Sequence, residues 1–310
     1  MNGDLDMNIR SLLALADEMQ CKVLYDEPLA RYTSFKIGGR CTAMVDINSP
    51  DALAQLAHEA DYLGVRTMAL GNGTNVLFDD RGFDGVIFLI GNSMDKIYMK
   101  NETTVTAQAG CSLLKLCRFA LEHSLSGLEF AYGIPGTVGG AVYMNAGAYG
   151  GETKDVVKLV RAVSPEGRQL EIDAGKLDMS YRHSRFCGSR ELIVEAEFEL
   201  VPGEHDTIQD KMVDLMSRRR EKQPLNYPSA GSTFKRPEGQ FAGQLIEQSG
   251  LKGFSVGGAQ VSEKHCGFVV NKGGATCGDV LGLIREVQER VREKTGFFLE
   301  CEVKYIPYKE

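Results

Sequence analysis

The sequence predicts a mixed α/β protein of two domains. Between residues 42 and 122, short apolar segments typical of strands alternate with segments whose apolar residues recur at helical spacing. A glycine-rich region, residues 133–151, interrupts this alternation, and Pro202-Gly203 precedes a further helical segment. A length of 310 residues suits two domains of common size. We therefore expect one domain over residues 1–203 and a second over residues 204–310.

The first elements alternate between strand and helix. Residues 42–47 predict a strand. Ser49-Pro50-Asp51 predicts a helix start, because a serine hydroxyl caps helices and proline fits the first turn. This helix should end near Gly64, which suits a left-handed cap. Further strands are expected over residues 65–70 and 85–90.

The middle of the chain predicts a helix, a glycine-rich loop and three strands. We expect a helix that starts at Ser112 and fades before Gly127. Residues 133–151 contain seven glycines, too many for a regular element of that length, so an ordered loop is expected there. The strands that follow are predicted over residues 157–164, 168–172 and 191–200.

Two helices and a strand are expected in the C-terminal part. One helix begins near Asp206 and ends at Pro224, and another ends at Gly296 after an apolar stripe. Residues 297–306 alternate as a strand does. That alternation predicts one face with Leu299, Cys301, Val303 and Tyr305 and the opposite face with Glu300, Glu302 and Lys304.

Composition argues against several classes of protein. A formal net charge of −7 disfavours broad nucleic-acid binding, because such proteins usually present a basic surface to phosphates. No segment has the length and apolar character of a membrane span or a secretory signal. The eight cysteines show no CxxC spacing and the five histidines no paired spacing, so we expect free thiols and no metal. We expect a cytoplasmic protein that binds neither nucleic acid nor membrane.

One segment is strongly basic within this acidic chain. From Arg218 to Arg236, six basic residues accompany a single acid, Glu221. A segment of this charge suits a small polyanion. The alternative is that the basic residues from Arg218 to Lys222 simply end a helix, where cations favour the negative end of the helix dipole.

A short glycine loop follows the strand predicted over residues 65–70. Residues 71–75 are GNGTN, and glycines let backbone N–H groups approach a diphosphate closely. A P-loop is excluded because its lysine and hydroxyl are missing, and the GxGxxG pattern is absent. A tight turn containing asparagine is the alternative. The glycines of residues 133–151 favour a cofactor, since two such loops can wrap a long dinucleotide, although glycine also serves close packing.

Six segments resemble, in order, the signatures of UDP-N-acetylenolpyruvoylglucosamine reductases. They are TSFKIGG (33–39), LGNGTNVLF (70–78), GLEFAYGIPGTVGGAVYMNAGAYGGE (127–152), YRHSRF (181–186), AGSTFKRP (230–237) and LECEVKYI (299–306). Together they span nearly the whole chain. Periodicity and composition alone indicate only an α/β protein with a dinucleotide-like loop, so the expectations that follow are those that this resemblance implies.

The resemblance implies an α+β fold with α/β character. Residues 1–203 would form a vanillyl-alcohol-oxidase-type FAD-binding domain of two subdomains, with a core at about residues 31–201. Residues 204–310 would form an α+β domain that binds a UDP-sugar and whose last strand returns to the active site. The implied reaction reduces UDP-N-acetylglucosamine enolpyruvate to UDP-N-acetylmuramate in peptidoglycan synthesis, with noncovalent FAD and with NADPH as hydride donor.

Carried over by motif, the resemblance assigns nine residues to the flavin cofactor. The residues that would line its diphosphate are Gly71, Asn72, Gly73, Thr74 and Asn75. Those that would lie against the flavin, with the loop beyond them, are Gly133, Ile134, Pro135 and Gly139. No separate nicotinamide-binding domain is expected, because NADPH and the UDP-sugar are thought to use the same face of the flavin in turn.

The same resemblance assigns Arg182, Ser232 and Glu302 to catalysis. Arg182 would clamp the substrate carboxylate with its planar charged group, and Glu302 would assist the enolate that develops. Ser232 would supply the proton that completes the lactyl ether. A serine hydroxyl is a weak acid and needs a polarising neighbour, for which Lys222, Lys235 and a water molecule are the candidates.

The resemblance also gives the basic segment a role. Arg218, Lys222 and Lys235 would bind the substrate, with its diphosphate as the charged partner. One position departs from the family pattern, because Arg236 stands where many relatives have asparagine after the lysine of the serine motif.

The chain is short between its catalytic arginine and serine. Longer relatives insert a segment there with a tyrosine that closes over the substrate, and this sequence resembles the shorter form without that lid. Tyr149, Tyr181 and Tyr227 are the candidate substitutes.

Three other functions compete with this interpretation. The nearest is another FAD oxidoreductase of the same fold acting on a small hydroxylated substrate, which would need a base where this motif offers an acid. A noncatalytic module that binds a UDP-sugar or a nucleotide would be colourless when purified. A serine hydrolase has little support, because the GxSxG elbow is missing and no histidine lies near Ser232 in sequence. We expect a monomer.

Overall fold

A computed structural model describes residues 6–309, which form two compact units. Unit 1 takes the described residues up to Tyr25 together with Ala43–Asn72 and Gly85–Arg218. Unit 2 takes Asp26–Thr42, Gly73–Asp84 and the chain from Arg219 onward. Each unit is therefore assembled from stretches that are far apart in the sequence.

Unit 1 contains a five-stranded antiparallel sheet of order β12-β11-β13-β7-β6. Its strands are β6 (Ile97–Met99), β7 (Thr104–Gln108), β11 (Val157–Val163), β12 (Gln169–Asp173) and β13 (Leu192–Glu199). The three strands predicted between residues 157 and 200 are thereby confirmed. Two short pairs accompany this sheet, β9 (Gly147–Ala148) with β10 (Gly151–Glu152) and β8 (Leu125–Ser126) with β14 (Val201–Pro202).

A second sheet has the order β1-β2-β5-β3. Its strands are β1 (Lys22–Pro28), β2 (Arg40–Asp46), β3 (Thr67–Leu70) and β5 (Gly82–Leu89), of which β3 and β5 are parallel. The predicted strands over residues 42–47, 65–70 and 85–90 correspond to β2, β3 and β5.

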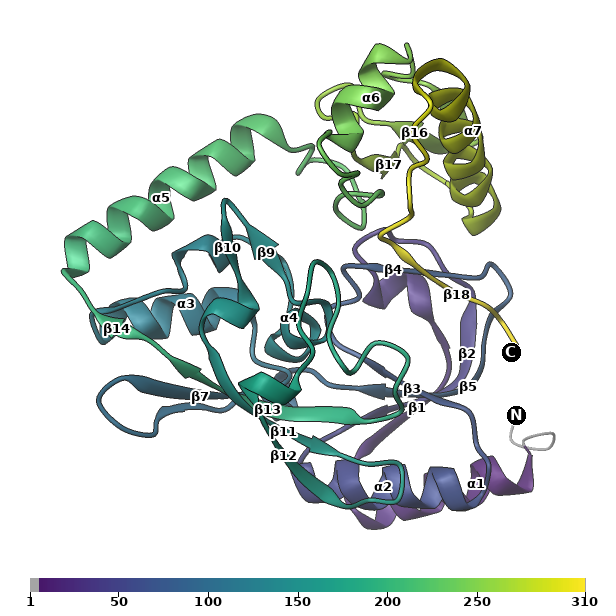
Figure 1. Cartoon of the computed structure of the whole chain (residues 1–310). Helices are drawn as coiled ribbons and strands as arrows, with labels where there is room; N and C mark the ends of the chain where they lie inside the picture. The colour runs from purple at the N-terminus through teal and green to yellow at the C-terminus, as the bar shows by residue number, and fades with distance from the viewer. Residues whose placement is uncertain (1–5, 310) are drawn as a thin grey trace. The chain divides into compact units, whose positions relative to one another are not determined.

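Helices α1 (Met7–Glu18) and α2 (Pro50–Tyr62) lie side by side in unit 1 (Figure 1). The hydroxyl of Ser49 accepts a hydrogen bond from the Ala52 amide at 3.2 Å, and Gly64 has a φ of +65° just after α2. Both ends of the predicted helix are therefore confirmed: a serine hydroxyl caps its start, and a left-handed glycine follows its end.

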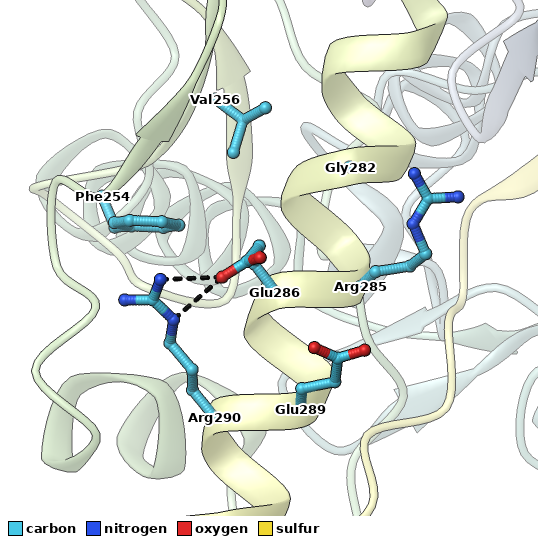
Figure 2. A pocket seen from close by; sticks show the side chains of 7 residues that line it. All are labelled: Phe254, Val256, Gly282, Arg285, Glu286, Glu289 and Arg290. Carbon is cyan, nitrogen blue, oxygen red and sulfur yellow. Dashed lines mark hydrogen bonds and ion pairs between the residues drawn. The ribbon is translucent and has the colours of Figure 1, made fainter.

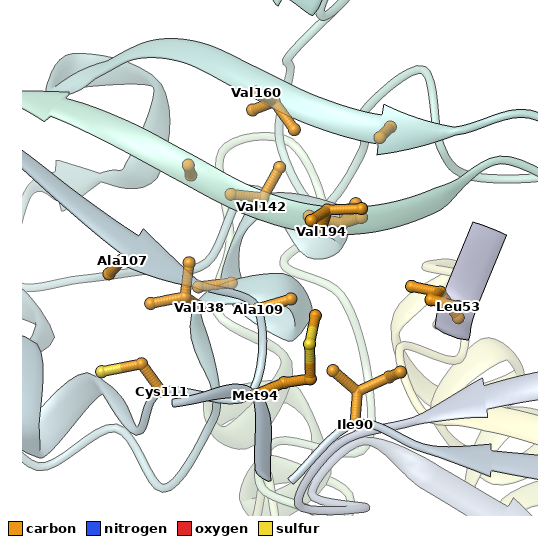
Figure 3. Packing of buried hydrophobic residues seen from close by; sticks show 14 of the residues in the cluster. Leu53, Ile90, Met94, Ala107, Ala109, Cys111, Val138, Val142, Val160 and Val194 are labelled. Atoms are coloured by element: carbon orange, nitrogen blue, oxygen red, sulfur yellow. The ribbon is translucent and has the colours of Figure 1, made fainter. Parts of the chain in front are cut away.

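Helices α3 (Leu113–Glu122) and α4 (Val138–Met144) complete the core of unit 1, and α5 (His205–Lys222) follows β14. Ser112 caps α3 as predicted. Figure 3 shows Val138 and Val142 of α4 among the buried side chains of the sheet strands, which include Ala107, Val160 and Val194. Burying each valine contributes about 1.5–3 kcal/mol to folding.

Unit 2 packs two helices on a three-stranded antiparallel sheet of order β15-β16-β17. The strands are β15 (Ser255–Val256), β16 (Ala259–Val261) and β17 (Val269–Asn271), and the helices are α6 (Ala242–Gln248) and α7 (Cys277–Thr295). Two further strands, β4 (Val76–Phe78) and β18 (Lys304–Ile306), pair in parallel.

Helix α7 is capped at both ends. Thr276 and Asp279 form a capping box, and the carboxylate of Asp80 accepts hydrogen bonds from the amides of Cys277 at 2.7 Å and Gly278 at 3.0 Å. Gly296, with a φ of +78°, ends the helix as predicted. These contacts connect the start of α7 to the chain just after β4.

Two sequence predictions are wrong in part. Residues 133–151 are not loop throughout, because the hydroxyl of Thr137 caps α4 and the buried Ala141 and Val142 anchor this short helix despite its glycines. Residues 297–306 do not form one strand. Only Lys304–Ile306 pairs as β18, whereas Cys301 pairs with Phe234, so the segment changes partner midway.

That change of partner also alters the predicted faces. Leu299 and Val303 are buried as expected, but Tyr305 is 41% exposed. Its hydroxyl donates a hydrogen bond to Asp79 at 2.6 Å, and Arg81 bonds the same carboxylate at 2.9 and 3.0 Å. The bonds from Arg81 and Tyr305 hold the pKa of Asp79 well below its usual range, and the bond to Asp79 raises the pKa of Tyr305 to about 12.

Replacing Tyr305 by phenylalanine should lower the free energy of unfolding by about 1 kcal/mol at pH 7, the net value of one hydrogen bond. The folded pKa of Asp79 is depressed, so its contribution is present above its unfolded pKa of about 4 and is lost as pH falls below that value. The folded pKa of Tyr305 is raised, so its contribution is lost as pH rises from about 10 toward about 12.

Urea unfolding at several pH values measures this difference between the native protein and Tyr305→Phe. The unfolded titration of Asp79 is common to both proteins and cancels, so the difference should stay constant near neutral pH and shrink above about pH 10, where the unfolded tyrosine ionises. Tyr98→Phe, which changes a tyrosine of β6 that is 47% exposed, is the matched control. A difference that stayed constant between pH 10 and pH 12 would show that the bond to Asp79 does not raise the pKa of Tyr305.

Candidate functional site

The GNGTN loop, residues 71–75, connects β3 to β4. Gly71 and Asn72 belong to unit 1, whereas Gly73 and the two residues after it belong to unit 2. At Gly71 a Cβ atom would lie 2.6 Å from Oγ1 of Thr137, closer than real Cβ contacts come. The glycine is therefore required by a close approach within unit 1.

The second glycine-rich loop meets the first at Thr137. Its segment 136–139 pairs with residues 109–113, with bonds from the Leu113 amide to Gly136 O at 3.0 Å and from the Val138 amide to Cys111 O at 2.8 Å. The Gly139 amide donates to Ala109 O at 2.8 Å, and a Cβ there would lie 3.0 Å from Ala109 Cβ. Gly139 thus serves close packing, since its N–H is already used.

The loop Gly133–Pro135 precedes this pairing. Gly133 has a φ of +92°, which favours glycine, and the Ile134 amide bonds Ala131 O at 3.0 Å. Unit 1 therefore brings together Gly71 and the turn that contains Thr137, and it places Gly133, Ile134 and Pro135 a few residues before that turn.

In unit 2, Gly73 also requires its lack of a side chain. Its φ is +58°, and a Cβ would lie 2.1 Å from the carbonyl oxygen of Tyr32. The amide of Ser34 donates to Gly73 O at 3.0 Å, which ties the loop to the TSFKIGG segment. Gly73, like Gly71, is therefore glycine because a neighbouring segment of its own unit lies too close for a side chain.

Ser232 and Glu302 lie on neighbouring segments of unit 2. Ser232 pairs with Phe268, and the next residue, Thr233, accepts a hydrogen bond from the Glu302 amide at 2.8 Å. Thr233 is buried, and its hydroxyl accepts from the Val269 amide at 2.9 Å. The main chain therefore brings together the predicted serine and the predicted glutamate, both half-buried.

The predicted lysines occupy different surroundings. Lys235 forms an ion pair with Glu300, and its amide donates to Glu300 O at 2.8 Å, so this side chain is held beside the Glu302 segment. Lys222 is exposed at the end of α5. Arg236 lies over the ring of Phe241, with 4.6 Å from Cζ to the ring centroid.

Arg218 is the last residue of unit 1 in α5 and forms an ion pair with Asp214 at 2.8 Å. The last turn of α5 carries Arg219, Arg220 and Lys222, so the helix-end interpretation of this basic run agrees with the structure. An exposed ion pair of this kind contributes little to stability, so Arg218 could leave Asp214 to bind another anion at little cost.

Arg182 lies in unit 1 in a tight turn. Ser180 and His183 exchange two backbone hydrogen bonds of 3.1 Å across it, and Arg182 has a φ of +56°. One guanidinium nitrogen donates to Gly147 O at 3.3 Å, and the group lies over the ring of Tyr181. A left-handed backbone at a residue with a long side chain is costly and often marks a functional site.

Asn145 is a residue that sequence reasoning missed. It is fully buried, and its side-chain amide donates to Glu152 Oε2 and to Ser180 O, each at 2.9 Å. Its Oδ1 accepts from the Lys154 amide at 2.9 Å. Asn145 thereby holds the first residue of the Arg182 turn, and its φ of +42° explains why an asparagine follows the helix there.

Glu152 carries a charge beside this turn. Its hydrogen bond with Lys154, and that with Asn145, lower the pKa of its carboxyl, and the charge of Arg182 acts in the same direction. Asn145 and Glu152 thus lie beside the Arg182 turn. In the sequence, the only feature that could have indicated these contacts is an asparagine within a glycine-rich run.

All three candidate tyrosines are exposed to solvent. Tyr149 and Tyr181 are each 44% exposed in unit 1, and Tyr227 is 38% exposed in unit 2. The hydroxyl of Tyr227 accepts a hydrogen bond from Lys272 Nζ at 2.8 Å.

An open groove of about 360 Å³ lies along α7 and involves none of the predicted site residues. Figure 2 shows Arg290 bonded to Glu286 and placed over the ring of Phe254. Arg290 and Glu286 therefore pair with each other at this groove.

The part of the chain that the structure describes contains no cluster of three His, Cys, Asp or Glu side chains that could hold a metal ion. Over residues 6–309, none of the helices combines the length and the apolar character that crossing a membrane requires.

Comparisons with known proteins agree with this arrangement. Residues 42–173 match the family described as an FAD binding domain, and residues 223–306 match the family described as the C-terminal domain of UDP-N-acetylenolpyruvoylglucosamine reductase. A UDP-N-acetylenolpyruvoylglucosamine reductase of Agathobacter rectalis is 47% identical over 300 residues, which cover 93% of this chain and 95% of that protein. A reductase of the same name from Syntrophomonas wolfei is 45% identical, with 92% of this chain and 95% of that protein covered.

A solved structure is similar over the same extent. The crystal structure of UDP-N-acetylenolpyruvylglucosamine reductase from Thermus caldophilus matches with a TM-score of 0.79 and 32% identity. The match covers 93% of this chain and 99% of that one.

Gly71→Ala should weaken FAD binding by about 10-fold or more, because the new methyl group would collide with Thr137 and overpacking costs about 1–3 kcal/mol. Thr137→Ala removes the obstructing hydroxyl, so the double variant should recover part of the lost affinity. Fluorescence titration of the flavin measures each dissociation constant. Gly91→Ala is the matched control, since a Cβ there would lie 3.9 Å from its nearest neighbour, Leu89 Cγ. If Gly71→Ala weakened FAD binding equally in the native and Thr137→Ala backgrounds, the collision with Thr137 would not be the cause.

Proposed function

The chain belongs to the UDP-N-acetylenolpyruvoylglucosamine reductase family, and we propose that Arg182, Ser232 and Glu302 carry out the chemistry of that family in it. It is an FAD-containing, NADPH-dependent oxidoreductase that reduces UDP-N-acetylglucosamine enolpyruvate to UDP-N-acetylmuramate, a peptidoglycan precursor. The observation that carries this function is identity of 45–47% to reductases over more than nine-tenths of the chain.

We assign the cofactor to the two glycine-rich loops. When bound, FAD supplies the hydride chemistry that links oxidation of NADPH to reduction of the enolpyruvyl group. We propose that the diphosphate is held by Gly71, Asn72, Gly73, Thr74 and Asn75 and that Gly133, Ile134, Pro135 and Gly139 lie against the flavin. The match of residues 42–173, which include both loops, to an FAD binding domain supports these assignments.

Arg182 is proposed to bind the carboxylate of the enolpyruvyl group. A guanidinium is permanently charged and presents parallel N–H donors that match a carboxylate. As hydride adds to the terminal carbon, negative charge develops on the adjacent carbon and its carboxylate, so a cation at this position stabilises the transition state more than the ground state.

Ser232 and Glu302 are proposed to complete the reduction. Glu302 would stabilise the enolate through a hydrogen bond, and the Ser232 Oγ–H would give its proton to the carbon that bears the negative charge. The hydrogen bond between the Glu302 amide and Thr233 O supports their joint action, because it holds their segments together within one unit. Lys222, Lys235 and a water molecule remain the candidates for polarising the serine.

We propose that Arg218, Lys222 and Lys235 bind the UDP diphosphate, for which their charge and accessibility provide the support. One of the exposed tyrosines Tyr149, Tyr181 and Tyr227 would then close over the substrate in place of the lid tyrosine of longer relatives.

We further propose that residues 1–203 bind FAD and that residues 204–310 bind the UDP-sugar. The family matches at 42–173 and 223–306 support this division. A monomer in the cytoplasm, with no nucleic-acid or membrane partner, is the proposed setting, supported by the acidic net charge and by the small, charged substrates NADPH and UDP-sugar.

The purified protein should be yellow, and NADPH should bleach its flavin absorbance under anaerobic conditions. This follows from the paired glycine-rich loops and the match to an FAD-binding family. Absorbance spectra before and after NADPH addition measure it. A colourless protein that takes up no FAD on reconstitution would contradict the cofactor assignment.

Ser232→Ala should leave bleaching by NADPH intact and slow reoxidation by UDP-N-acetylglucosamine enolpyruvate by at least about 100-fold, the usual loss when a positioned acid is removed. Stopped-flow absorbance separates the two half-reactions. Ser255→Ala, a change of an exposed serine on β15, is the control and should retain both rates. Normal reoxidation by Ser232→Ala would remove this serine from the mechanism.

A further inference from the structure

The main chain of Glu302 is held from two sides within unit 2. Its amide donates to Thr233 O at 2.8 Å, and its carbonyl oxygen accepts a hydrogen bond from Nδ2 of Asn75 at 3.3 Å. One contact comes from the segment that carries Ser232, and the other comes from the last residue of the GNGTN loop.

Asn75 also starts the pairing of β4 with β18. Its carbonyl oxygen accepts from the Lys304 amide at 3.0 Å, and the parallel register then runs from Val76 opposite Lys304 to Phe78 opposite Ile306. The side-chain amide of Asn75 reaches one step further, to residue 302. It therefore continues the ladder of the strand pair beyond the point where the backbone pairing ends.

Glu302 lies where the C-terminal segment changes partner. Up to this residue the segment bonds the serine segment, through Lys235 N to Glu300 O and Glu302 N to Thr233 O, both at 2.8 Å. From Lys304 onward it bonds β4. Glu302 lies between the last bond to the serine segment and the first pair of β4 with β18, so a side chain that binds its carbonyl contributes to how the residue is turned.

We propose that Asn75 is a positioning residue for Glu302. By holding the Glu302 carbonyl, the Asn75 amide sets the direction in which the glutamate side chain leaves the strand, and so aligns its carboxyl group with the enolate of the substrate. This inference rests on the proposed catalytic role of Glu302. It gives the last residue of a cofactor-loop motif a function in the step that consumes the enolpyruvyl substrate.

The proposal predicts a kinetic phenotype different from that of a residue that only binds cofactor. Asn75→Ala should slow reoxidation by UDP-N-acetylglucosamine enolpyruvate by about 10- to 100-fold, the usual range for a misplaced catalytic group. Asn75 is also assigned to the FAD diphosphate, so bleaching by NADPH is compared with every variant saturated with FAD. Under those conditions bleaching should be slowed at least about 5-fold less than reoxidation. Asn75→Asp keeps the size of the side chain but loses the N–H donors, so it should show the same selective loss and separates hydrogen bonding from packing.

The decisive experiment compares Asn75→Ala in the native and Glu302→Gln backgrounds, with each variant loaded with FAD and followed by stopped-flow absorbance. If Asn75 acts through Glu302, its replacement should cost less than about 2-fold once the glutamate is changed. Asn72→Ala, at the other asparagine of the motif, should lower FAD affinity with no preference for the reoxidation step.

The possible results separate the two ideas. Normal reoxidation by Glu302→Gln would contradict the catalytic role of Glu302 itself. Two outcomes, each with slow reoxidation by Glu302→Gln, would overturn the positioning role alone. In one, Asn75→Ala slows reoxidation equally in both backgrounds. In the other, Asn75→Ala slows bleaching as much as reoxidation. If Asn75→Ala does not fold, Asn75→Asp is measured in both backgrounds and decides by the same criterion.

Discussion

The arrangement of unit 2 depends on a change of hydrogen-bonding partner at Glu302. The C-terminal segment first bonds the serine segment and then pairs in parallel with β4, which directly follows the glycine loop. This one crossing brings a residue near the end of the chain beside a residue 70 positions earlier in the sequence, Ser232. The bonds of Tyr305 and Arg81 to Asp79 hold the second half of the crossing in place.

The close approach of neighbouring segments is the corresponding constraint on the GNGTN loop. Gly71 abuts Thr137, and Gly73 abuts the carbonyl of Tyr32, so neither position has room for a side chain. This crowding by neighbouring segments explains why both positions are glycine.

Much of the fold could be predicted from local signals. The cap at Ser49, the stop at Gly296 and the strands of residues 157–200 follow from capping chemistry and periodicity. The strand of residues 297–306 was predicted wrongly, because alternation does not reveal that a segment changes neighbours. The motif resemblance named Ser232 and Glu302, but the contacts of Asn75 and Asn145 are set by tertiary structure and leave only weak traces in the sequence.

The central claim is that the flavin-loaded chain passes reducing equivalents from NADPH to the enolpyruvyl ether. The most direct measurement follows nicotinamide absorbance after UDP-N-acetylglucosamine enolpyruvate is added to FAD-loaded protein and NADPH, together with mass spectrometry of the product. The account predicts that NADPH is consumed in equal amount to the substrate and that the product is heavier by two hydrogen atoms. A flavin-loaded protein whose NADPH consumption does not respond to this substrate would contradict it.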